Sequence, residues 1–411
     1  MSDLMKYDHY LNDDGPAALV IREYLVPETG PDGVLFPPTF AAGDNFAGGY
    51  NIDGDPNGEN VCLVDSVGSQ ANRIEPIFAK EPYKALVPQV VIKAGDKQVN
   101  LLEAGHRAGD AIVRCSSLQK DLQDAFKAVL KGNAKPLATI APTSLVFGVW
   151  DSRDTQAKLP RLVASTIRAF NVRKLTRSAQ YNPATEYVNE KLLDEPTDKA
   201  TKDAYAERGF IHVPATGSHG GIIAKGGIRR DATLGLAALR LLNAGEDTLP
   251  LRRYILGLAL VAFTVNTSSY LRQGCVLVMD VVRPRDFVEV FPDGKRVPCS
   301  ITHEAALHFA QDAAKAFSRS KDRLVEFDKA LATADVKGET AAEDKIKGKI
   351  VKVEPNNFTV KKGNKKIKVP TTEGTVYFKG NVESSYGAVV IMQAPVEVDR
   401  ANGIAVKVTG S

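Results

Sequence analysis

Residues 61–75 read VCLVDSVGSQANRIE and join two kinds of local structure. The apolar run 61–65 predicts a short buried strand, and residues 69–75 predict a helix that follows it directly. Four residues with hydrogen-bond donors lie at the start of this helix: Ser69, Gln70, Asn72 and Arg73. Free N–H groups at a helix start can bind phosphate, and such side chains add further donors. A capped helix in which Arg73 has only a structural role accounts for the segment equally well.

Around this stretch, strand and helix patterns mix without the regular alternation of a parallel sheet, which predicts an α+β body. A long Gly/Pro/Asn-rich loop, residues 27–60, is typical of a functional or mobile segment. Strands are predicted at 18–26, 143–150 and 274–282, with hairpins at 87–102 and from 287. Helices are predicted at 118–131, 159–170, 232–242, 251–265 and in 303–333.

After residue 337 the pattern changes to short alternating β-type runs, so we predict a body at 1–337 and a small β-rich domain or appendage at 338–411. The runs are 349–353, 358–361, 365–369, 376–379, 389–392 and 404–408. Residues 345–368 contain nine lysines and one acid, Glu354. Two interpretations of these lysines remain open: an accessory nucleic-acid contact, or protection of exposed strand edges from aggregation.

Charge is distributed unevenly along the 411 residues, whose net charge is +4. Residues 1–60 contain eleven acids and two bases, so the remainder carries an excess of positive charge. This separation suggests a basic surface for a polyanion and an acidic segment that contacts basic neighbours. Four well-separated cysteines argue against a disulfide framework or zinc ribbon, and no targeting or membrane-spanning segment is evident. We therefore expect a soluble, cytoplasmic protein.

Catalytic motifs are mostly absent from the sequence. The glycine-rich segment 221–226 lacks the Lys-Ser/Thr pair of a P-loop, and no G-x-S-x-G elbow occurs. His303 and His308 are five residues apart, so on a helix they cannot share a metal as an i, i+4 pair does. Thr302 is better explained as the cap of that helix. The sequence thus predicts no catalytic site, no metal and no cofactor.

Two further segments are rich in donors. Residues 150–161 contain Ser152, Arg153 and Arg161, and Arg168 follows one heptad after Arg161 on the predicted helix, an arrangement that suits a phosphate backbone. Residues 216–230 place five glycines among donor residues, and a helix is predicted to start near Arg230. The donors of this second segment are Ser218, His219, Lys225, Arg229 and Arg230. A solvated helix and a mobile loop are the alternatives.

Four strings resemble the backbone subunit of a type I CRISPR effector complex (Cascade), within the RAMP superfamily and most like subtype I-U or I-G. They are residues 64–75, 104–114, 144–153 and 218–221, and the resemblance spans roughly 15–330. It implies an RRM-like (ferredoxin-like) core with finger and thumb insertions. The β-rich tail has no match in that family. The string of paired aromatics with which an RRM stacks bases is absent, so stacking on the sheet face is not expected.

The same resemblance implies a non-catalytic scaffold. Copies of the chain would form a filament along one CRISPR RNA and present its spacer to target DNA in antiviral defence, together with other Cascade subunits. The string 104–114 adds Arg107 and Arg114 to the candidates. The expected RNA contacts are Ser69, Gln70, Asn72, Arg73, Arg107, Arg114, Ser152, Arg153, Arg161, Ser218, His219, Lys225, Arg229 and Arg230.

Two alternatives of other classes remain. A metal-independent endoribonuclease of the same superfamily would use His9, His106 or His219 for acid–base catalysis. A glycine-loop nucleotide enzyme would bind mononucleotides, whereas a scaffold needs a chain of several nucleotides.

Overall fold

The computed structural model describes residues 3–55, 58–317, 319–337, 345–362, 365–371, 375–379, 382–391, 395–401 and 404–410. The chain divides into two compact units. Unit 1 comprises Met1–Val91, Val99–Gly109 and Asp124–Arg323, and unit 2 comprises Ile92–Gln98, Asp110–Gln123 and Leu324–Ser411. Helices and strands occur in both units, which confirms the predicted α+β class.

Unit 1 is built on a nine-stranded antiparallel sheet. Its strands are β1 (Ala18–Pro27), β4 (Ile52–Gly54), β5 (Asn60–Asp65), β10 (Val163–Phe170), β13 (Ile228–Gly235), β14 (Tyr270–Arg272), β15 (Cys275–Met279), β16 (Asp286–Val290) and β17 (Arg296–Pro298). Their order is β14–β15–β1–β13–β10–β5–β4, with β16 paired to β1 and β17 to β16. The predicted strands near 18–26, 61–65 and 274–282 and the hairpin from 287 are confirmed.

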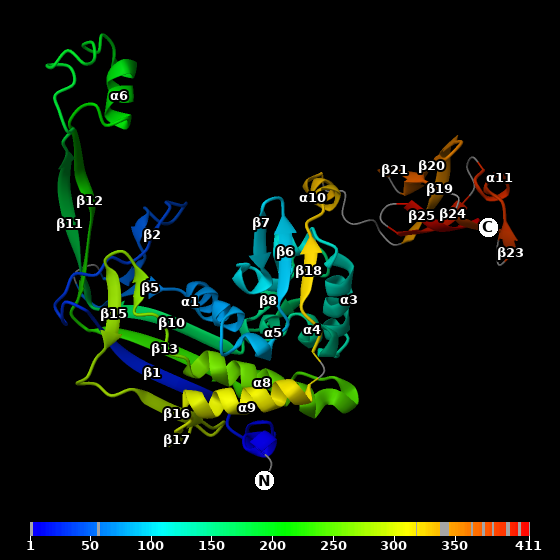
Figure 1. The fold of residues 1–411 in the computed structure, drawn as a ribbon, viewed down its shortest axis with the longest axis horizontal. Coiled ribbons are helices and arrows are strands. Elements are labelled where there is room, and N and C mark those ends of the chain that lie inside the picture. The colour runs from blue at the N-terminus through cyan, green and yellow to red at the C-terminus, as the bar shows by residue number, and fades with distance from the viewer. Residues whose placement is uncertain are drawn as a thin grey trace. The chain divides into compact units, whose positions relative to one another are not determined.

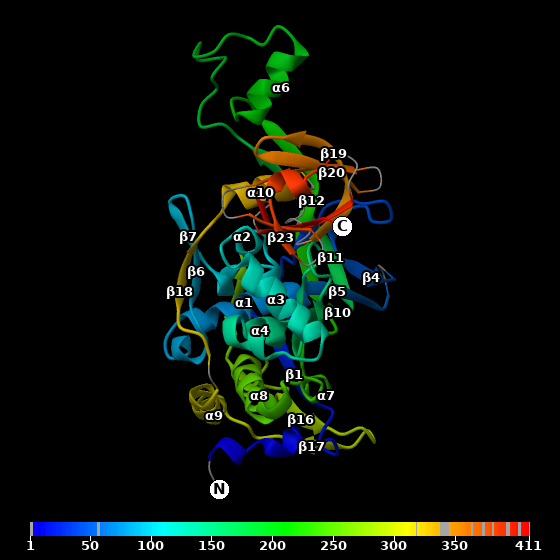
Figure 2. The same ribbon diagram turned by 90° about the vertical axis from the view of Figure 1, so that its right-hand side faces the viewer.

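Helices cover one face of this sheet (Figures 1 and 2). They include α1 (Val67–Ile74), α8 (Thr248–Thr264) and α9 (His303–Ala316). α8 contacts β10 and β13 on one side and α9 on the other, which explains why it is apolar around its circumference. Thr302 caps α9 by accepting a hydrogen bond from the Ala305 N–H, as predicted.

The other face of the sheet is less covered, and we call it the open face. On β1, Leu19 and Ile21 are fully buried, whereas the intervening Val20 and the following Arg22 and Tyr24 retain exposure. β13 alternates in the same way. Because successive side chains of a strand point to opposite faces, the non-buried residues share the open face.

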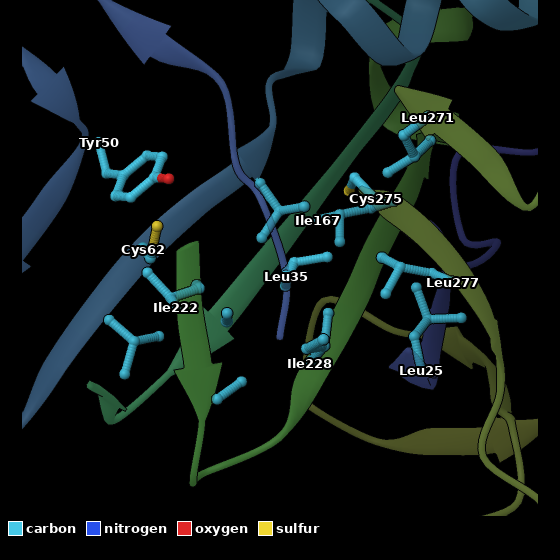
Figure 3. Packing of buried hydrophobic residues seen from close by; sticks show 14 residues of the cluster. Leu25, Leu35, Tyr50, Cys62, Ile167, Ile222, Ile228, Leu271, Cys275 and Leu277 are labelled. Carbon is cyan, nitrogen blue, oxygen red and sulfur yellow. The ribbon is translucent and has the colours of Figure 1, made fainter. Parts of the chain in front are cut away.

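Part of the buried face packs against the long loop 27–60 (Figure 3). Leu35 is 1% exposed and exchanges two backbone hydrogen bonds with Ile222, and Tyr50 packs in the same cluster. The cluster also contains Ile167 and Ile228 from the central strands. This part of the loop is therefore a component of the core.

A long two-stranded ribbon projects from the sheet of unit 1, formed by β11 (Val172–Tyr181) and β12 (Val213–Ala224). The intervening chain carries α6 (Lys199–Glu207) at its far end (Figure 1). The polar chain between β11 and β12 thus forms the tip of this ribbon. Arg173, Lys174 and Arg177 are exposed along β11.

Three predicted elements in the body are wrong. Residues 143–150 form the buried helix α5 (Thr143–Phe147) and the short strand β8 (Val149–Trp150), not one strand. Residues 159–170 form β9 (Lys158–Leu159) and β10, not a helix. Residues 232–242 contain the end of β13 and the short helix α7 (Leu236–Leu239).

The error at β10 has an identifiable cause. Ser165, Ile167 and Ala169 alternate toward the core, but Ser and Ala lack the β-branched or aromatic side chains that usually mark a strand, so the strand period is not evident. Pro160 fits a helix start, yet here it precedes a strand. In such short apolar segments, packing in the core selects the secondary structure, even where the local preference of the residues differs.

Unit 2 contains a seven-stranded sheet with the order β21–β20–β19–β24–β25–β22–β23. Its strands are β19 (Lys345–Glu354), β20 (Asn357–Lys362), β21 (Lys365–Pro370), β22 (Val376–Lys379), β23 (Val382–Ser384), β24 (Pro395–Ala401) and β25 (Ile404–Gly410). Ile350, Phe358, Val360, Val369 and Val398 form its core. The strand predicted at 389–392 is wrong, because Tyr386–Val389 is the helix α11; Met392 lies outside the described residues.

The remaining elements are short. The hairpin of β6 (Val90–Ala94) and β7 (Lys97–Asn100) is confirmed, and β18 (Arg323–Glu326) pairs with β6. The other strands are β2 (Thr39–Phe40) and β3 (Gly49–Tyr50), and the other α-helices are α2 (Ala111–Arg114), α3 (Gln119–Leu130), α4 (Lys135–Ile140) and α10 (Lys329–Val336). The 3-10 helices are η1 (Asp3–Met5), η2 (Asp8–Tyr10), η3 (Glu75–Ala79), η4 (Lys84–Leu86), η5 (Leu101–Glu103), η6 (Arg107–Gly109) and η7 (Gly245–Asp247). Within the described ranges, no helix has the length and apolarity needed to cross a bilayer.

Candidate nucleic-acid interface

A buried carboxylate organises the junction of β5 and α1. Asp65 is fully buried, and its Oδ2 accepts hydrogen bonds from Gln70 Nε2 at 2.6 Å and Arg73 Nε at 3.1 Å. Its Oδ1 accepts from a terminal guanidinium nitrogen of Arg272 at 3.0 Å. A buried charge needs such partners, since an unpaired one costs several kcal/mol. The sequence prediction did not identify Arg272, which lies far along the chain.

This arrangement separates the predicted donors of α1. Gln70 is 1% exposed and also accepts from Ser165, so it offers no donor at the surface. The Arg73 side chain is 34% exposed, and Asn72 is exposed beside it. Ser69 is half-buried, and its backbone N–H is bound by the side chain of the cap residue Ser66. Arg73 and Asn72 are the accessible donors here.

Arg107 forms a buried ion pair with Glu75. Arg107 Nε lies 2.6 Å from Glu75 Oε2, and the two side chains are 4% and 1% exposed. The guanidinium lies 5.3 Å from the Phe147 ring centroid and donates to the Gly148 carbonyl. Burial raises the pKa of Glu75 to about 7, although Arg107 opposes this change. The expected surface contact of Arg107 with RNA requires an exposed guanidinium, so the structure does not support it.

Arg230 is buried in a similar pair. It lies on β13 directly opposite Glu23 of β1, and its Nε is 3.3 Å from Glu23 Oε2. Its side chain is 5% exposed. The helix predicted to start at Arg230 is therefore wrong, and this guanidinium is directed into the fold.

The hairpin of β8 and β9 presents an aromatic and a cationic side chain. Trp150 is 58% exposed, and Lys158 Nζ lies 5.4 Å from its ring centroid. The two residues are cross-strand partners. Ser152 and Arg153, both predicted contacts, are exposed in the connecting loop. Together they form a compact exposed group with two cations.

The same loop is held by Asp151, which is 2% exposed. Its Oδ2 accepts from the Thr155 N–H at 2.8 Å and the Thr155 hydroxyl at 2.6 Å. These bonds fix the loop between the two strands. Arg161 follows it, exposed, with Nε donating to the Phe147 carbonyl at 3.1 Å. Arg161 and Arg168 do not share a helix face, because Arg168 is on β10.

The open face carries a row of arginine and aromatic residues that the sequence prediction only partly identified. Tyr24, Arg229 and Arg168 are paired in register across β1, β13 and β10. The Arg229 guanidinium lies 5.0 Å from the Phe170 ring centroid and also pairs with Asp231. Charged and aromatic residues alternating with apolar ones would have revealed this face, had β10 and β13 been recognised as strands.

A third arginine, Arg283, extends this row. The Arg283 guanidinium lies 4.6 Å from the Tyr24 ring centroid and pairs with Asp280 at 2.7 Å. Arg283 also lines a pocket of about 380 Å³ together with Lys225, a predicted contact that is exposed. Asp32 is the acid in its lining. Two cations and one acid leave this pocket with a positive balance.

The glycines next to Lys225 serve the fold itself. A Cβ on Gly226 would lie 2.9 Å from the Phe170 carbonyl oxygen. Gly227 has φ +84°, and a Cβ there would lie 2.8 Å from the Arg283 guanidinium. Close packing and a left-handed backbone therefore explain both residues without a ligand.

His219 packs within unit 1. Its ring lies 4.9 Å from that of Tyr50, and a Cβ on Gly49 would lie 2.5 Å from it. Ser218 pairs through its backbone with Arg177, but its side chain lies outside the described residues. Arg114 belongs to unit 2 and makes a two-pronged contact with Asp335 at 3.3 and 3.2 Å.

The histidines of the endoribonuclease alternative lie on separate elements. His9 is in η2, His106 precedes η6, and His219 is in β12. Both ring nitrogens of His303 are engaged, with the Tyr83 hydroxyl at 2.8 Å and the Thr264 hydroxyl at 3.0 Å. No group of three His, Cys, Asp or Glu suited to a metal occurs in the part of the chain that the structure describes.

Comparison with known proteins gives one family match. Residues 19–174 match the family model described as CRISPR-associated protein GSU0053. A solved structure titled "CRISPR RNA-guided surveillance complex, pre-nicking" matches with 11% identity and a TM-score of 0.31, covering 78% of this chain and 99% of that chain. A TM-score this low does not establish a common fold. No curated protein matches. Over less than half of its length, the chain is thus similar to a family of CRISPR-associated proteins.

Proposed function

We propose that this protein is a non-catalytic CRISPR RNA-binding subunit of a Cascade-type effector complex of type I, in the cytoplasm. The match of residues 19–174 to a CRISPR-associated family is the observation that carries this proposal. That region contains β1, β5, α1 and β10, and therefore most of the exposed donors described above. The order β16–β1–β13–β10 in an antiparallel sheet supports an RRM-like core.

The exposed donors suit contact with sugar and phosphate rather than with base edges. Arg73, Arg153, Arg161 and Lys225 are accessible cations on different elements of unit 1. Dispersed cations bind a phosphate backbone without reading sequence. A subunit that holds a guide in this way leaves its bases free to pair with target DNA. We propose further copies of the chain and other Cascade subunits as its partners.

Expression of the protein together with a CRISPR array tests the proposal. We expect the purified protein to carry RNA of defined length, protected from added nuclease. Purified protein incubated with precursor RNA should leave it uncut, and the His219→Ala variant should behave identically. Cleavage that disappears in His219→Ala would instead establish the endoribonuclease alternative. Saturable binding of a mononucleotide, without binding of longer RNA, would identify a nucleotide enzyme.

A further inference from the structure

The polar face of the unit 2 sheet carries lysines on three adjacent strands. Lys349 of β19 is paired with Lys361 of β20, and Lys361 is paired with Lys366 of β21. All three are exposed. Their neighbours Ile350 and Val360 are fully buried, so the lysines lie on the face opposite the core.

This row is electrostatically unfavourable by itself. Like charges directly opposite each other on neighbouring strands destabilise a sheet, and here the arrangement occurs twice in succession. Lys352 and Lys368, which flank the row, are both paired with Glu354, at 2.6 and 3.4 Å. Among the described residues, no acid pairs with the three lysines of the row. A polyanion bound to this face would neutralise its charge.

The strand order distinguishes the two interpretations that the sequence left open. Protection against aggregation requires lysines on an edge strand, where backbone groups are unpaired. Lys366 meets this condition, since β21 is the last strand in the order. Lys349 and Lys361 do not, because β19 and β20 each pair with strands on both sides. Edge protection therefore accounts for one lysine of the three.

We infer that this lysine row is a sequence-independent contact for a nucleic-acid backbone. Neighbouring strands are about 4.8 Å apart, so the row extends about 10 Å across the sheet. Flexible ammonium groups at this spacing can follow successive phosphates, and they do not impose a fixed register. Thr359 and Asn357, on the same face, are polar, so this part of the face favours a polyanion in water over insertion into a membrane. The inference does not depend on the guide-RNA site of unit 1.

The test uses the full chain with Lys349, Lys361 and Lys366 changed together to Gln. A labelled DNA duplex and a labelled single-stranded RNA of equal length, each of arbitrary sequence, are titrated at several salt concentrations by fluorescence anisotropy. The matched control changes three exposed lysines of unit 1 to Gln: Lys80, Lys84 and Lys127.

We expect the row variant to reduce the slope of log K against log salt by about three for at least one of the two probes. The control should leave that slope unchanged. Unchanged binding of both probes in a folded row variant, or an equal loss in the control, overturns the inference. The inference is also overturned if vesicles of an anionic phospholipid, titrated in parallel, are the only probe whose binding the variant loses.

Two partial variants separate the inference from edge protection. Lys349→Gln with Lys361→Gln should lower the slope by about two and leave solubility unchanged. If Lys366→Gln alone causes aggregation and the interior double variant binds both probes as the parent does, the lysines protect an edge and the inference is wrong.

Discussion

Glu75 and Arg107 are in direct contact inside unit 1, with Arg107 Nε 2.6 Å from Glu75 Oε2 and both side chains almost fully buried. Glu75 is the last residue of the string 64–75, and Arg107 belongs to the string 104–114; both strings carry the CRISPR resemblance. Two candidate RNA-binding segments are thus joined by a structural ion pair. Charged residues in these strings are not all available to a ligand.

Removing Arg107 should destabilise the protein in a pH-dependent way. Arg107→Met leaves Glu75 buried without its cation, which costs about 3–5 kcal/mol when the carboxylate is charged. The folded-state pKa of Glu75 is already raised to about 7, and loss of Arg107 raises it further. The carboxyl is therefore neutral in the folded variant at low pH, and the loss of stability should be smaller at about pH 5.5 than at about pH 8. Urea unfolding at both values measures this.

The same pKa also sets how the stability of the unsubstituted protein depends on pH. A carboxyl whose pKa is higher in the folded state binds more protons there, so its contribution to stability falls as pH rises from about 4.5 to about 7. Glu75→Gln should remove this slope. Combined with Arg107→Met, it should leave a pH-independent loss. An equal loss at both pH values in Arg107→Met alone would contradict the assignment of the pH dependence to this pair.

Exposed and buried arginines should respond differently in RNA binding. Arg153→Gln removes an exposed cation, so it should reduce the salt slope of RNA binding by about one and leave Tm unchanged. Arg230→Gln removes the nearer of the two cations that pair with Glu23 and leaves only Arg285, at 4.0 Å, so it should lower Tm. Anisotropy titration on RNAs of two unrelated sequences, with calorimetry of the free protein, separates the effects. Loss of binding to only one sequence would indicate base readout and count against the scaffold.

Trp150 is the single tryptophan of the chain, and its emission reports on the β8–β9 hairpin directly. Under the proposed function we expect a base of bound RNA to stack on this exposed ring beside Lys158. Titration with RNA should quench the emission. Trp150→Leu should weaken binding by about 1–3 kcal/mol.

The matched control is Tyr270→Leu, which removes another exposed aromatic ring of unit 1. It should leave RNA affinity unchanged. Binding that anisotropy detects without any change in emission would show that Trp150 lies outside the RNA path, while the proposed function itself would stand.

Local pattern predicted some elements well and others poorly. The continuous apolar run in α8 predicted its helix, because length and composition agree with burial on all sides. α5 and β10 are short and wholly or largely buried, and their local preferences conflict with the packing that selects their structure. The two confirmed hairpins were predictable because glycine and aspartate in their turns, Gly95 with Asp96 and Asp293 with Gly294, specify them locally.

The candidate site shows the same division. The sequence identified the donors of α1. It did not show that Asp65 accepts hydrogen bonds from Gln70, Arg73 and the distant Arg272, since these residues meet only in the folded chain. Nor did charge distinguish the buried Arg107 from the exposed Arg153. Exposure is a property of tertiary packing, so donor-rich strings give candidates without ranking them.

The acidic N-terminal region should control assembly on RNA. Asp13, Asp14, Asp44 and Asp53 are all exposed, and no ion pair is formed by them among the residues that the structure describes. In the proposed filament they would face basic surface on the next copy, and a repeated head-to-tail contact of opposite charges sets the register between copies.

Changing all four to Asn should therefore shorten the assemblies formed on a long RNA, while binding to an RNA that holds one copy should remain or strengthen. Size analysis with multi-angle light scattering measures the assemblies. A closed two-fold dimer in the parent protein, unaffected by the substitutions, would refute this arrangement.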